Sequence, residues 1–414
     1  MDQISDNGNS SMTCIVQKYG GSSLADVDKI MKVAEIIARV KQQGMDVAVV
    51  VSAMGKTTNQ LVDMARSISP KPPRREMDML LSTGERVTMS LLCMALHQLG
   101  IESVSLTGSQ CGIITNHRHN DAQVIEVRPF RVQDELAEGK VVVVGGFQGV
   151  SYKRDITTLG RGGSDTTAVA LAAALDAQRC EIYSDVDGVY SADPSIVAEA
   201  RHLPEISYPV MQEMSAAGAK VLNAQAVQFA KEKQIAIYAG STFDRRKETI
   251  VRKIAPGRVV GVQAVVSEKE ITRLRIKGKN ALSDFSWASD FLEREQVPIK
   301  EVHVTEGSDD PNSSRASFIV SSPDIYGWSE IQARMEQHLG EAVQFDAHLS
   351  ALSLIGEGLN RDSTTLLETI TLLQQHSIPI AGVTTTSFRI SMLVPREKID
   401  ESVRLCHGKW VAVA

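Results

Sequence analysis

Apolar residues follow two alternating patterns along the first part of the chain. Short runs such as CIVQKYGG, starting at residue 14, and DVAVVVSAMG, starting at residue 46, are almost wholly apolar and end in glycine. Between them, DVDKIMKVAEIIARVKQQG has apolar residues at helical spacing and a glycine at its end. Buried strands that alternate with amphipathic helices are typical of a mostly parallel sheet with helices on both faces. We therefore expect an α/β fold here.

Further apolar runs extend this pattern to about residue 245. They read ESVSLTG, KVVVVGGFQG, CEIYSDVDG and QIAIYAGST, starting at residues 102, 140, 180 and 234. Each run ends in polar residues or glycine. Open α/β sheets bind their ligands at the carboxyl ends of the strands, so we expect the functional site at this edge of the sheet.

The pattern changes after residue 245 to a short internal repeat. The charged stretch DRRKETIVRKIAPGR, residues 244–258, reads as a linker. Beyond it, ITRLRIKGKN and LSALSLIGEGLN each precede a helical run, a Val/Ile-Pro-Ile step and another strand. The repeat predicts two small βαβ-type sandwiches. Their helices are expected to turn a common set of apolar residues to the core: Phe291, Leu292, Leu366, Leu367 and Ile370.

Composition narrows the class of protein. The 414 residues are 43% hydrophobic, enough for two or three packed units, and the net charge of -6 offers no basic field for nucleic acid or an anionic membrane. No uncharged apolar run approaches the roughly 20 residues of a membrane helix, and the start resembles no signal peptide. The five scattered cysteines suit reduced thiols. We expect a soluble, cytoplasmic protein.

Two glycine turns are candidates for anion binding. KYGGSS, residues 18–23, and LGRGGSD, residues 159–165, each follow a strand and precede a helix. Backbone N–H groups at such turns, together with the helix N-terminus, attract anions. GKT at residues 55–57 is no P-loop, because Val50 stands where the first glycine of that motif belongs.

A third cluster of polar residues lies in YSDVDGVYSADP, residues 183–194. Three carboxylates, Asp185, Asp187 and Asp193, fall within nine residues. Their spacing is not that of an EF-hand loop. They could bind a ligand or simply cap a turn, and the residues alone leave both open.

Taken together, these motifs resemble the aspartate kinases of the amino-acid-kinase family. KYGGSS, VVVSAMGKTTNQL, MDMLLSTGER, TGSQCGI, GFQGV, TTLGRGGSDTTAVALAAAL and YSDVDGVYSADP occur in the family's order over residues 14–245, and the tail is similar to the paired ACT regulatory domains of these enzymes. The resemblance implies a three-layer sandwich with a mainly parallel eight-stranded sheet, followed by two βαββαβ-type, α+β, ACT-like domains. It also implies transfer of the ATP γ-phosphoryl group to the side-chain carboxylate of L-aspartate, which gives 4-phospho-L-aspartate on the route to lysine, threonine and methionine.

The resemblance also assigns roles to individual residues on the aspartate side. Lys18 resembles the lysine that stabilises the transferring phosphoryl group, within a loop of Gly20, Gly21, Ser22 and Ser23. Arg161 resembles the clamp on the α-carboxylate of aspartate, and Glu85 would hold the substrate ammonium. The remaining pocket residues would be Thr58, Ser164 and Asp165. Capping of a helix by Ser164 and Asp165, and an ion pair of Glu85 with Arg86, are the structural alternatives.

On the nucleotide side, the resemblance implies ATP contacts from residues of four segments. These are Lys18, Tyr19, Gly20, Gly21, Ser184, Asp185, Tyr190, Asp193 and Lys220. Mg²⁺ would ride on the phosphates with few protein ligands, so no protein metal site is predicted. A carboxylate acceptor is already ionised at neutral pH, so no general base is expected.

The chain departs from the family pattern at several positions. Ser195 replaces an arginine in DPS, LNAQA at residues 222–226 replaces L-H-P-R-A, and Asn116 replaces a common aspartate. In the tail, KGKNALS at residues 277–283 lacks the D-x-P-G ligand loop, and GEGLNRDSTT lacks its later glycine. The resemblance implies feedback by lysine or threonine at these domains. Because of these departures, a role as a homo-oligomer interface is a second expectation.

The expected domain boundaries follow from these segments. They are a disordered start at 1–13, a catalytic domain at 14–245, a linker at 246–262, and ACT-like domains at 263–344 and 345–414, with the last strand free to return to the first domain. Two other functions remain open at this stage. One is a non-catalytic amino-acid sensor on the same fold, and the other is a sister kinase acting on another carboxylate.

Overall fold

The computed structural model describes residues 14–160, 162–219, 221–254, 260–307, 313–322, 325 and 327–411. They divide into two compact units. The first contains the described residues of 14–189, 202–212 and 220–254, and the second contains those of 190–201, 213–219 and 255–414. The expected disordered segment 1–13 lies outside the described residues.

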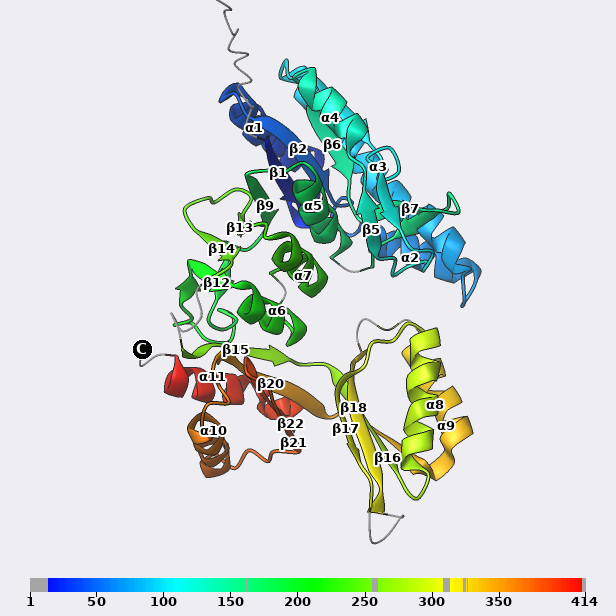
Figure 1. Cartoon of the computed structure of the whole chain (residues 1–414), viewed down its shortest axis with the longest axis vertical. Coiled ribbons are helices and arrows are strands. Elements are labelled where there is room, and N and C mark those ends of the chain that lie inside the picture. Colours follow the sequence, from blue (N-terminus) through cyan, green and yellow to red (C-terminus); the bar gives the residue numbers. More distant parts are fainter. Residues whose placement is uncertain are drawn as a thin grey trace, which may run out of the picture. The chain divides into compact units, whose positions relative to one another are not determined.

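An eight-stranded sheet forms the centre of the first unit, in the order β12-β14-β13-β9-β1-β2-β6-β3 (Figure 1). Neighbouring strands pair in parallel except β13 and β14, so the predicted mainly parallel sheet is confirmed. All six apolar runs of the sequence are strands of this sheet. The strands are β1 (Cys14–Tyr19), β2 (Asp46–Val51), β3 (Ser103–Leu106), β6 (Val141–Gly145), β9 (Arg179–Ser184), β12 (Glu205–Ser207), β13 (Ile237–Ser241) and β14 (Glu248–Arg252).

Helices cover both faces of this sheet. Alternate residues of β1, β2 and β6 pack on α1 and α3 in one core cluster, while α5 and α4 contact these strands as well. Asp26 caps α1 by accepting a hydrogen bond from the Lys29 N–H at 2.8 Å. The helices are α1 (Val27–Gln42), α2 (Thr57–Ile68), α3 (Arg74–Gln98), α4 (Phe130–Ala137), α5 (Gly163–Ala174), α6 (Tyr208–Ala216) and α7 (Ala224–Lys233).

A smaller four-stranded sheet lies in the same unit, in the order β5-β4-β7-β8. Its last strand leads directly into the glycine turn before α5. The strands are β4 (Ile113–Thr115), β5 (Val124–Val127), β7 (Gln148–Ser151) and β8 (Ile156–Thr158); the short strands β10 (Val189–Tyr190) and β11 (His202–Leu203) and the 3-10 turn η1 (Gly21–Leu24) complete the elements up to residue 254.

The second unit contains two antiparallel four-stranded sheets, β17-β18-β16-β19 and β15-β20-β22-β21. The first carries α8 and α9 in the chain order βαββαβ, as the ACT resemblance implies. The elements are β15 (Gly261–Glu268), β16 (Ile271–Lys277), α8 (Ala281–Arg294), β17 (Lys300–Thr305), β18 (Arg315–Ser321), α9 (Trp328–Leu339), η4 (Gly340–Ala342), β19 (Val343–Asp346), β20 (Leu349–Glu357), α10 (Thr364–Gln375), β21 (Gly382–Thr385), β22 (Arg389–Pro395), η5 (Arg396–Lys398) and α11 (Ile399–Trp410).

The course of the chain differs from the expected boundaries at two places. β14 lies inside the expected linker 246–262 but belongs to the large sheet. β15, placed with the first ACT-like domain by sequence, pairs along β20 of the second, from Gly261 opposite Glu357 to Glu268 opposite Ala351. Its Val265 is fully buried in the core of that second sheet. The tail therefore exchanges its first strand into the second domain rather than returning its last strand to the first.

Four of the five apolar residues predicted to face the core of the second unit do so, and one does not. Phe291 and Leu292 are buried, and Leu366 and Ile370 pack partly buried against the core, as expected. Leu367 is 59% exposed, so its assignment to the core face was wrong. It lies one residue, or about 100° around the helix, from Leu366, and the buried face of α10 continues through Ile370 and Leu373 instead.

Candidate active site

The carboxyl ends of β1, β2, β6 and β9 meet at one edge of the large sheet. Backbone hydrogen bonds join the segments that leave these strands: the Ser52 N–H donates to the Tyr19 carbonyl at 3.1 Å, the Gly146 N–H to the Val51 carbonyl at 3.0 Å, and the Gly20 N–H to the Tyr183 carbonyl at 3.0 Å. The predicted ligand edge is therefore a continuous rim of strand ends and turns.

Lys18 and Asp165 form an ion pair at this edge. Lys18 Nζ lies 2.7 Å from Asp165 Oδ1, and both side chains are about nine-tenths buried. Lys18 points from β1 toward the face of the sheet covered by α5, whose first turn carries Asp165. Two residues predicted from separate motifs thus come together with their charged ends in a largely buried site, where electrostatic interactions are strong.

The KYGGSS turn brings the backbone close to this pair. A Cβ on Gly21 would lie 2.7 Å from the Ala53 carbonyl oxygen, so only glycine fits there. The position of a Cβ on Gly20 is 3.6 Å from Lys18 Nζ. Ser22 is exposed, whereas Ser23 is buried and its hydroxyl lies 2.6 Å from that of Thr242. Ser22 is therefore the hydroxyl of this turn that is open to a ligand, and Ser23 holds the turn.

Glu85 lies on α3, close to the end of β2. It is 2% exposed, and its Oε1 accepts a hydrogen bond from the Ala53 N–H at 3.1 Å. Its Oε2 is buried and has no hydrogen-bond partner among the described residues. Burial raises the pKa of Glu85 to about 7, and the Ala53 N–H offsets only part of this rise. A buried carboxylate oxygen without a partner is costly, and a cationic ligand group would relieve that cost.

Gly84 allows α3 to approach Ala53 closely enough for this bond. A Cβ on Gly84 would lie 2.8 Å from the Cβ of Ala53. Although alanine favours helix by about 1 kcal/mol over glycine, we expect the clash in Gly84→Ala to dominate and to lower the free energy of unfolding by about 1–3 kcal/mol. Thermal unfolding should show this. Gly408→Ala is the matched control, since Gly408 lies inside α11 with open space around its Cβ position, and it should leave stability unchanged or raised. Equal stability changes in the two variants would contradict the packing argument.

The LGRGGSD turn sets the start of α5. Gly160 and Gly162 have φ values of +72° and +70°, which favour glycine, and Gly162 is the N-cap. Ser164 is 7% exposed, and its hydroxyl lies 2.8 Å from where a Cβ on Gly146 would stand. Arg161, the predicted carboxylate clamp, lies outside the described residues. The helix after it is packed with small buried side chains, as its alanine-rich sequence predicts.

Asn223, one of the departures from the family pattern, packs against this turn. Its side chain lies 2.5 Å from where a Cβ on Gly162 would stand. The same side chain caps α7 by accepting hydrogen bonds from the N–H groups of Gln225 and Ala226, at 2.8 and 3.2 Å. Asn223 thus joins the start of α7 to the start of α5. Lys220, three residues earlier, lies outside the described residues.

On the nucleotide side, Ser184 ends β9 and Asp185 is exposed in the turn that follows. Close to this turn is a cavity of about 380 Å³, lined by Asp187, Asp244, Arg246 and Lys247. Lys247 Nζ lies 3.7 Å from Asp187 Oδ2. The sequence analysis reads the DRRK stretch as the start of a linker, and its spacing to the 183–188 turn gave no signal of this cavity.

Three of the predicted nucleotide contacts, Tyr190, Asp193 and Tyr19, do not lie on the turn that follows Ser184. Tyr190 and Asp193 belong to the second unit. Asp193 caps a turn there, since its Oδ1 accepts hydrogen bonds from the N–H and hydroxyl of Ser195 at 2.9 and 2.6 Å. The Tyr19 ring is fully buried on the sheet face away from Lys18, so Tyr19 borders the edge through its backbone. Thr58 is half-buried in the first turn of α2.

A buried polar network beneath Lys18 had no signal in the sequence. Gln17 donates to Glu181 at 2.7 Å, and the Tyr183 hydroxyl donates to the same carboxylate oxygen at 2.9 Å. The Tyr19 hydroxyl donates to Gln17 at 3.2 Å. These contacts link the residues on either side of Lys18 to β9, where Lys18 pairs in register with Ile182.

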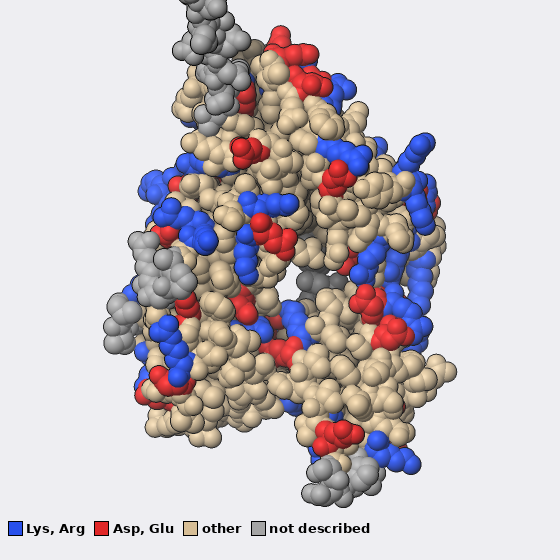
Figure 2. All heavy atoms as spheres, viewed as in Figure 1, with Lys and Arg blue, Asp and Glu red and all other residues tan. Residues whose placement is uncertain are grey.

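On the face shown in Figure 2, acidic side chains lie beside the basic ones rather than leaving one extended basic field. One described helix, α3, is long and apolar enough to span a membrane, but 56% of its apolar window is buried inside the protein. Its apolar length is that of a core helix. Among the described residues, no group of three or more His, Cys, Asp or Glu side chains is arranged to hold a metal ion.

Comparison with known proteins gives a consistent result. Residues 13–240 match the model of the amino acid kinase family. An aspartokinase of Mycolicibacterium smegmatis is 40% identical over 403 residues, which cover 96% of each chain. Two structures of E. coli aspartokinase III have similar folds. The one in complex with aspartate and ADP has a TM-score of 0.82 and 24% identity, and the match covers 95% of this chain and 99% of that one. The one in complex with lysine and aspartate has a TM-score of 0.75 and 22% identity, and the match covers 96% of this chain and 99% of that one. The chain therefore belongs to the aspartokinases of the amino acid kinase family.

Proposed function

We propose that this aspartokinase transfers the γ-phosphoryl group of ATP to the side-chain carboxylate of L-aspartate at the edge of the large sheet, giving 4-phospho-L-aspartate and ADP. The observation that carries the proposal is the buried Lys18–Asp165 pair at 2.7 Å, on the same rim of strand ends as Glu85 with its unpartnered oxygen. This arrangement offers a cation for phosphate and an anion for an ammonium group. The product would enter the biosynthesis of lysine, threonine and methionine.

The chemistry requires positioning and charge neutralisation rather than proton abstraction. The aspartate carboxylate is ionised at neutral pH, with an ordinary pKa near 4, so it attacks without a base. Lys18 would neutralise the charge that spreads over the transferring phosphoryl oxygens. Gly20, Gly21 and Ser22 would surround the phosphates, since their turn already places its backbone beside Lys18 Nζ.

The aspartate substrate would lie between α3 and the start of α5. Glu85 Oε2 would accept from the substrate ammonium, which gives a hydrogen bond to a buried oxygen that has no partner among the described residues. Arg161 would clamp the α-carboxylate through its planar guanidinium group. Ser164 and Thr58 would supply hydroxyl contacts, and Asp165 would orient Lys18.

The nucleotide would follow the turn after β9. Ser184 and Asp185 would contact it, with Lys220 as a further proposed contact. Mg²⁺ would neutralise phosphate charge when bound. The described residues fit an ion held chiefly by phosphates, because such an ion needs only one or two carboxylates and Asp165 is a buried carboxylate beside Lys18.

Trapping the product tests this function. The protein would be incubated with ATP, Mg²⁺ and either aspartate or glutamate, and any acyl phosphate would be captured with hydroxylamine. We expect hydroxamate from aspartate and little from glutamate. Hydroxamate from glutamate alone would identify a sister kinase, and none from any carboxylate would favour a non-catalytic sensor.

The second unit is proposed to bind an amino-acid effector, lysine or threonine, and to mediate homo-oligomer formation. The proposal is supported by the ACT-like order of its elements and by the lysine present in one of the similar E. coli structures. Calorimetric titration with lysine, threonine and methionine, singly and in pairs, should show heat with lysine or threonine. No heat from any of them would favour a purely structural role.

A cytoplasmic location is proposed from the five free cysteines.

A further inference from the structure

Asp78 is a fully buried carboxylate that no part of the proposed chemistry uses. It lies on α3, seven residues before Glu85. Seven residues are two helical turns, so Asp78 and Glu85 share the face of α3 that is turned into the first unit. Burial raises the pKa of Asp78, and hydrogen bonds from Thr158, His119 and Asn120 offset part of that rise. A carboxylate buried at such a cost has to be paired.

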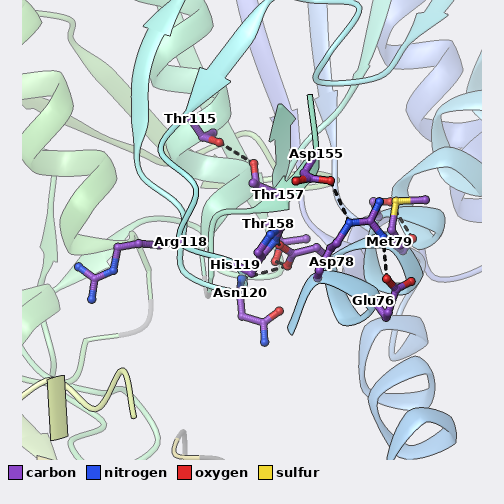
Figure 3. Close-up of polar contacts among 12 residues, drawn as sticks. Glu76, Asp78, Met79, Thr115, Arg118, His119, Asn120, Asp155, Thr157 and Thr158 are labelled. Carbon is purple, nitrogen blue, oxygen red and sulfur yellow. Dashed lines mark hydrogen bonds and ion pairs between the residues drawn. The ribbon is translucent and has the colours of Figure 1, made fainter. Parts of the chain in front are cut away.

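Three donors from two other segments converge on this carboxylate (Figure 3). The Thr158 hydroxyl donates to Asp78 Oδ1 at 2.5 Å, and the Asn120 N–H donates to the same oxygen at 3.0 Å. His119 Nδ1 lies 2.6 Å from Asp78 Oδ2. Asp78 thus joins α3 to the end of β8 and to the loop of residues 116–123. The Arg118 side chain of that loop points away from the cluster.

The loop of residues 116–123 is itself closed and packed on the glycine turn. Asn116 Oδ1 accepts hydrogen bonds from the N–H groups of Arg118 and Gln123, each at 3.2 Å. The Ala122 N–H donates to the Thr158 carbonyl at 2.9 Å. A Cβ on Gly160 would lie 3.0 Å from Asp121 Oδ1, so the loop packs closely against this glycine. The loop and β8 therefore locate the first residue of the turn that leads to Ser164 and Asp165.

We propose that Asp78 is a positioning residue for the aspartate side of the site: it fixes β8, and with it the start of the glycine turn, against the helix that carries Glu85. This inference rests on the proposed function, because the gap between Glu85 and the start of α5 matters only if the substrate spans it. Misplacement by about 1 Å can cost about 10²-fold in rate or binding. Loss of the hydrogen bonds to Asp78 should therefore weaken the binding of aspartate. The proposed nucleotide contacts Ser184 and Asp185 lie at the end of β9, which belongs to a different sheet from β8. KM for ATP should therefore be unaffected.

Three variants of the full-length protein test the proposal through steady-state kinetics. Asp78→Ala removes all three bonds and is expected to raise KM for aspartate by about 10-fold or more. Thr158→Val removes one bond while keeping the volume, and Asp78→Asn keeps an oxygen acceptor, so both should show a smaller rise, about 3-fold, in the same direction. KM for ATP should stay within about 2-fold in all three. Thr158→Val and Asp78→Asn decide the question if Asp78→Ala does not fold.

Asp155→Asn provides a matched control. Asp155 accepts from Arg75 Nε at 2.9 Å and so joins α3 to the start of β8, but this pair is exposed and contributes little. We expect Asp155→Asn to leave both KM values unchanged. An unchanged KM for aspartate in folded Thr158→Val and Asp78→Asn, with only a lower melting temperature, would overturn the positioning role. A wild-type protein that yields no hydroxamate from aspartate would instead overturn the proposed function.

Discussion

Lys18→Met is expected to lower kcat by about 10³-fold while leaving KM for aspartate within a few-fold. The ammonium group of Lys18 is buried beside Asp165, and removal of a preorganised charge from a buried site costs about 10²–10³-fold or more in rate. Methionine keeps most of the length of the side chain and removes the ammonium group, with its charge and its hydrogen-bond donors. Single-turnover and steady-state rates with saturating ATP would measure the loss.

A double variant separates catalysis from ion-pair stability. In Lys18→Met the Asp165 carboxylate is left buried without its partner, which by itself destabilises the protein. Lys18→Met combined with Asp165→Asn removes that unpaired charge. If Lys18 acts on the phosphoryl group, the double variant regains stability and stays inactive. Recovery of most of the activity in the double variant would show that Lys18 serves only to pair with Asp165.

Glu85→Gln is expected to raise KM for aspartate by about 10²-fold with little change in KM for ATP. The amide keeps an oxygen that can accept from the Ala53 N–H, but it loses the charge that pairs with the substrate ammonium, and loss of a buried charge partner costs about 2–5 kcal/mol. Steady-state kinetics with each substrate varied in turn would measure both constants. A rise in KM for ATP alone would place Glu85 on the other substrate.

The pKa of Glu85 adds a dependence on pH with a definite sign. The pKa is about 7 in the folded chain and near 4.5 when unfolded, so the folded state holds this proton more tightly. The stabilising contribution is therefore complete below pH 4.5 and is lost as the pH rises through 7. Relative to Glu85→Gln, the free protein should lose on the order of 3 kcal/mol of unfolding free energy between pH 4 and pH 8.

Binding of aspartate should show the matching trend. The substrate ammonium favours the ionised carboxylate, so aspartate must displace a proton from Glu85 below pH 7. KM for aspartate should fall as the pH rises from 6 to 8 in the wild-type protein and stay flat over this range in Glu85→Gln. Equal pH dependence in the two proteins would contradict the assignment of this titration to Glu85.

The parts of the site that the sequence predicts are those built from local pattern. Apolar runs that end in glycine marked β1, β2, β6 and β9, and their shared edge follows from the parallel sheet. The family motifs then identified Lys18, Glu85 and Asp165, and the structure brings Lys18 to Asp165. Sequence alone could not show that these two charges pair, because the pairing depends on which face of β1 meets α5.

Contacts between distant segments were beyond prediction for the same reason. Thr158 and Asp78 are 80 residues apart in sequence and His119 and Asp78 are 41 apart, so no spacing pattern links them. The exchange of β15 into the second small sheet depends on which edge strand offers the better apolar partner, and the repeat leaves that open. Three departures from the family pattern have local explanations instead: Asn116 and Asn223 accept backbone N–H groups, and Ser195 donates to Asp193.

The position of the new bond in the product tests the central claim most directly. Aspartate labelled with ¹³C at the side-chain carboxyl carbon would be incubated with ATP, Mg²⁺ and the protein, and the mixture followed by ¹³C and ³¹P spectroscopy. We predict a new acyl phosphate signal with ¹³C–³¹P coupling at the labelled carbon, present with the wild-type protein and lost in Lys18→Met. Formation of ADP without that coupled signal, or an acyl phosphate on another carboxylate, would contradict it.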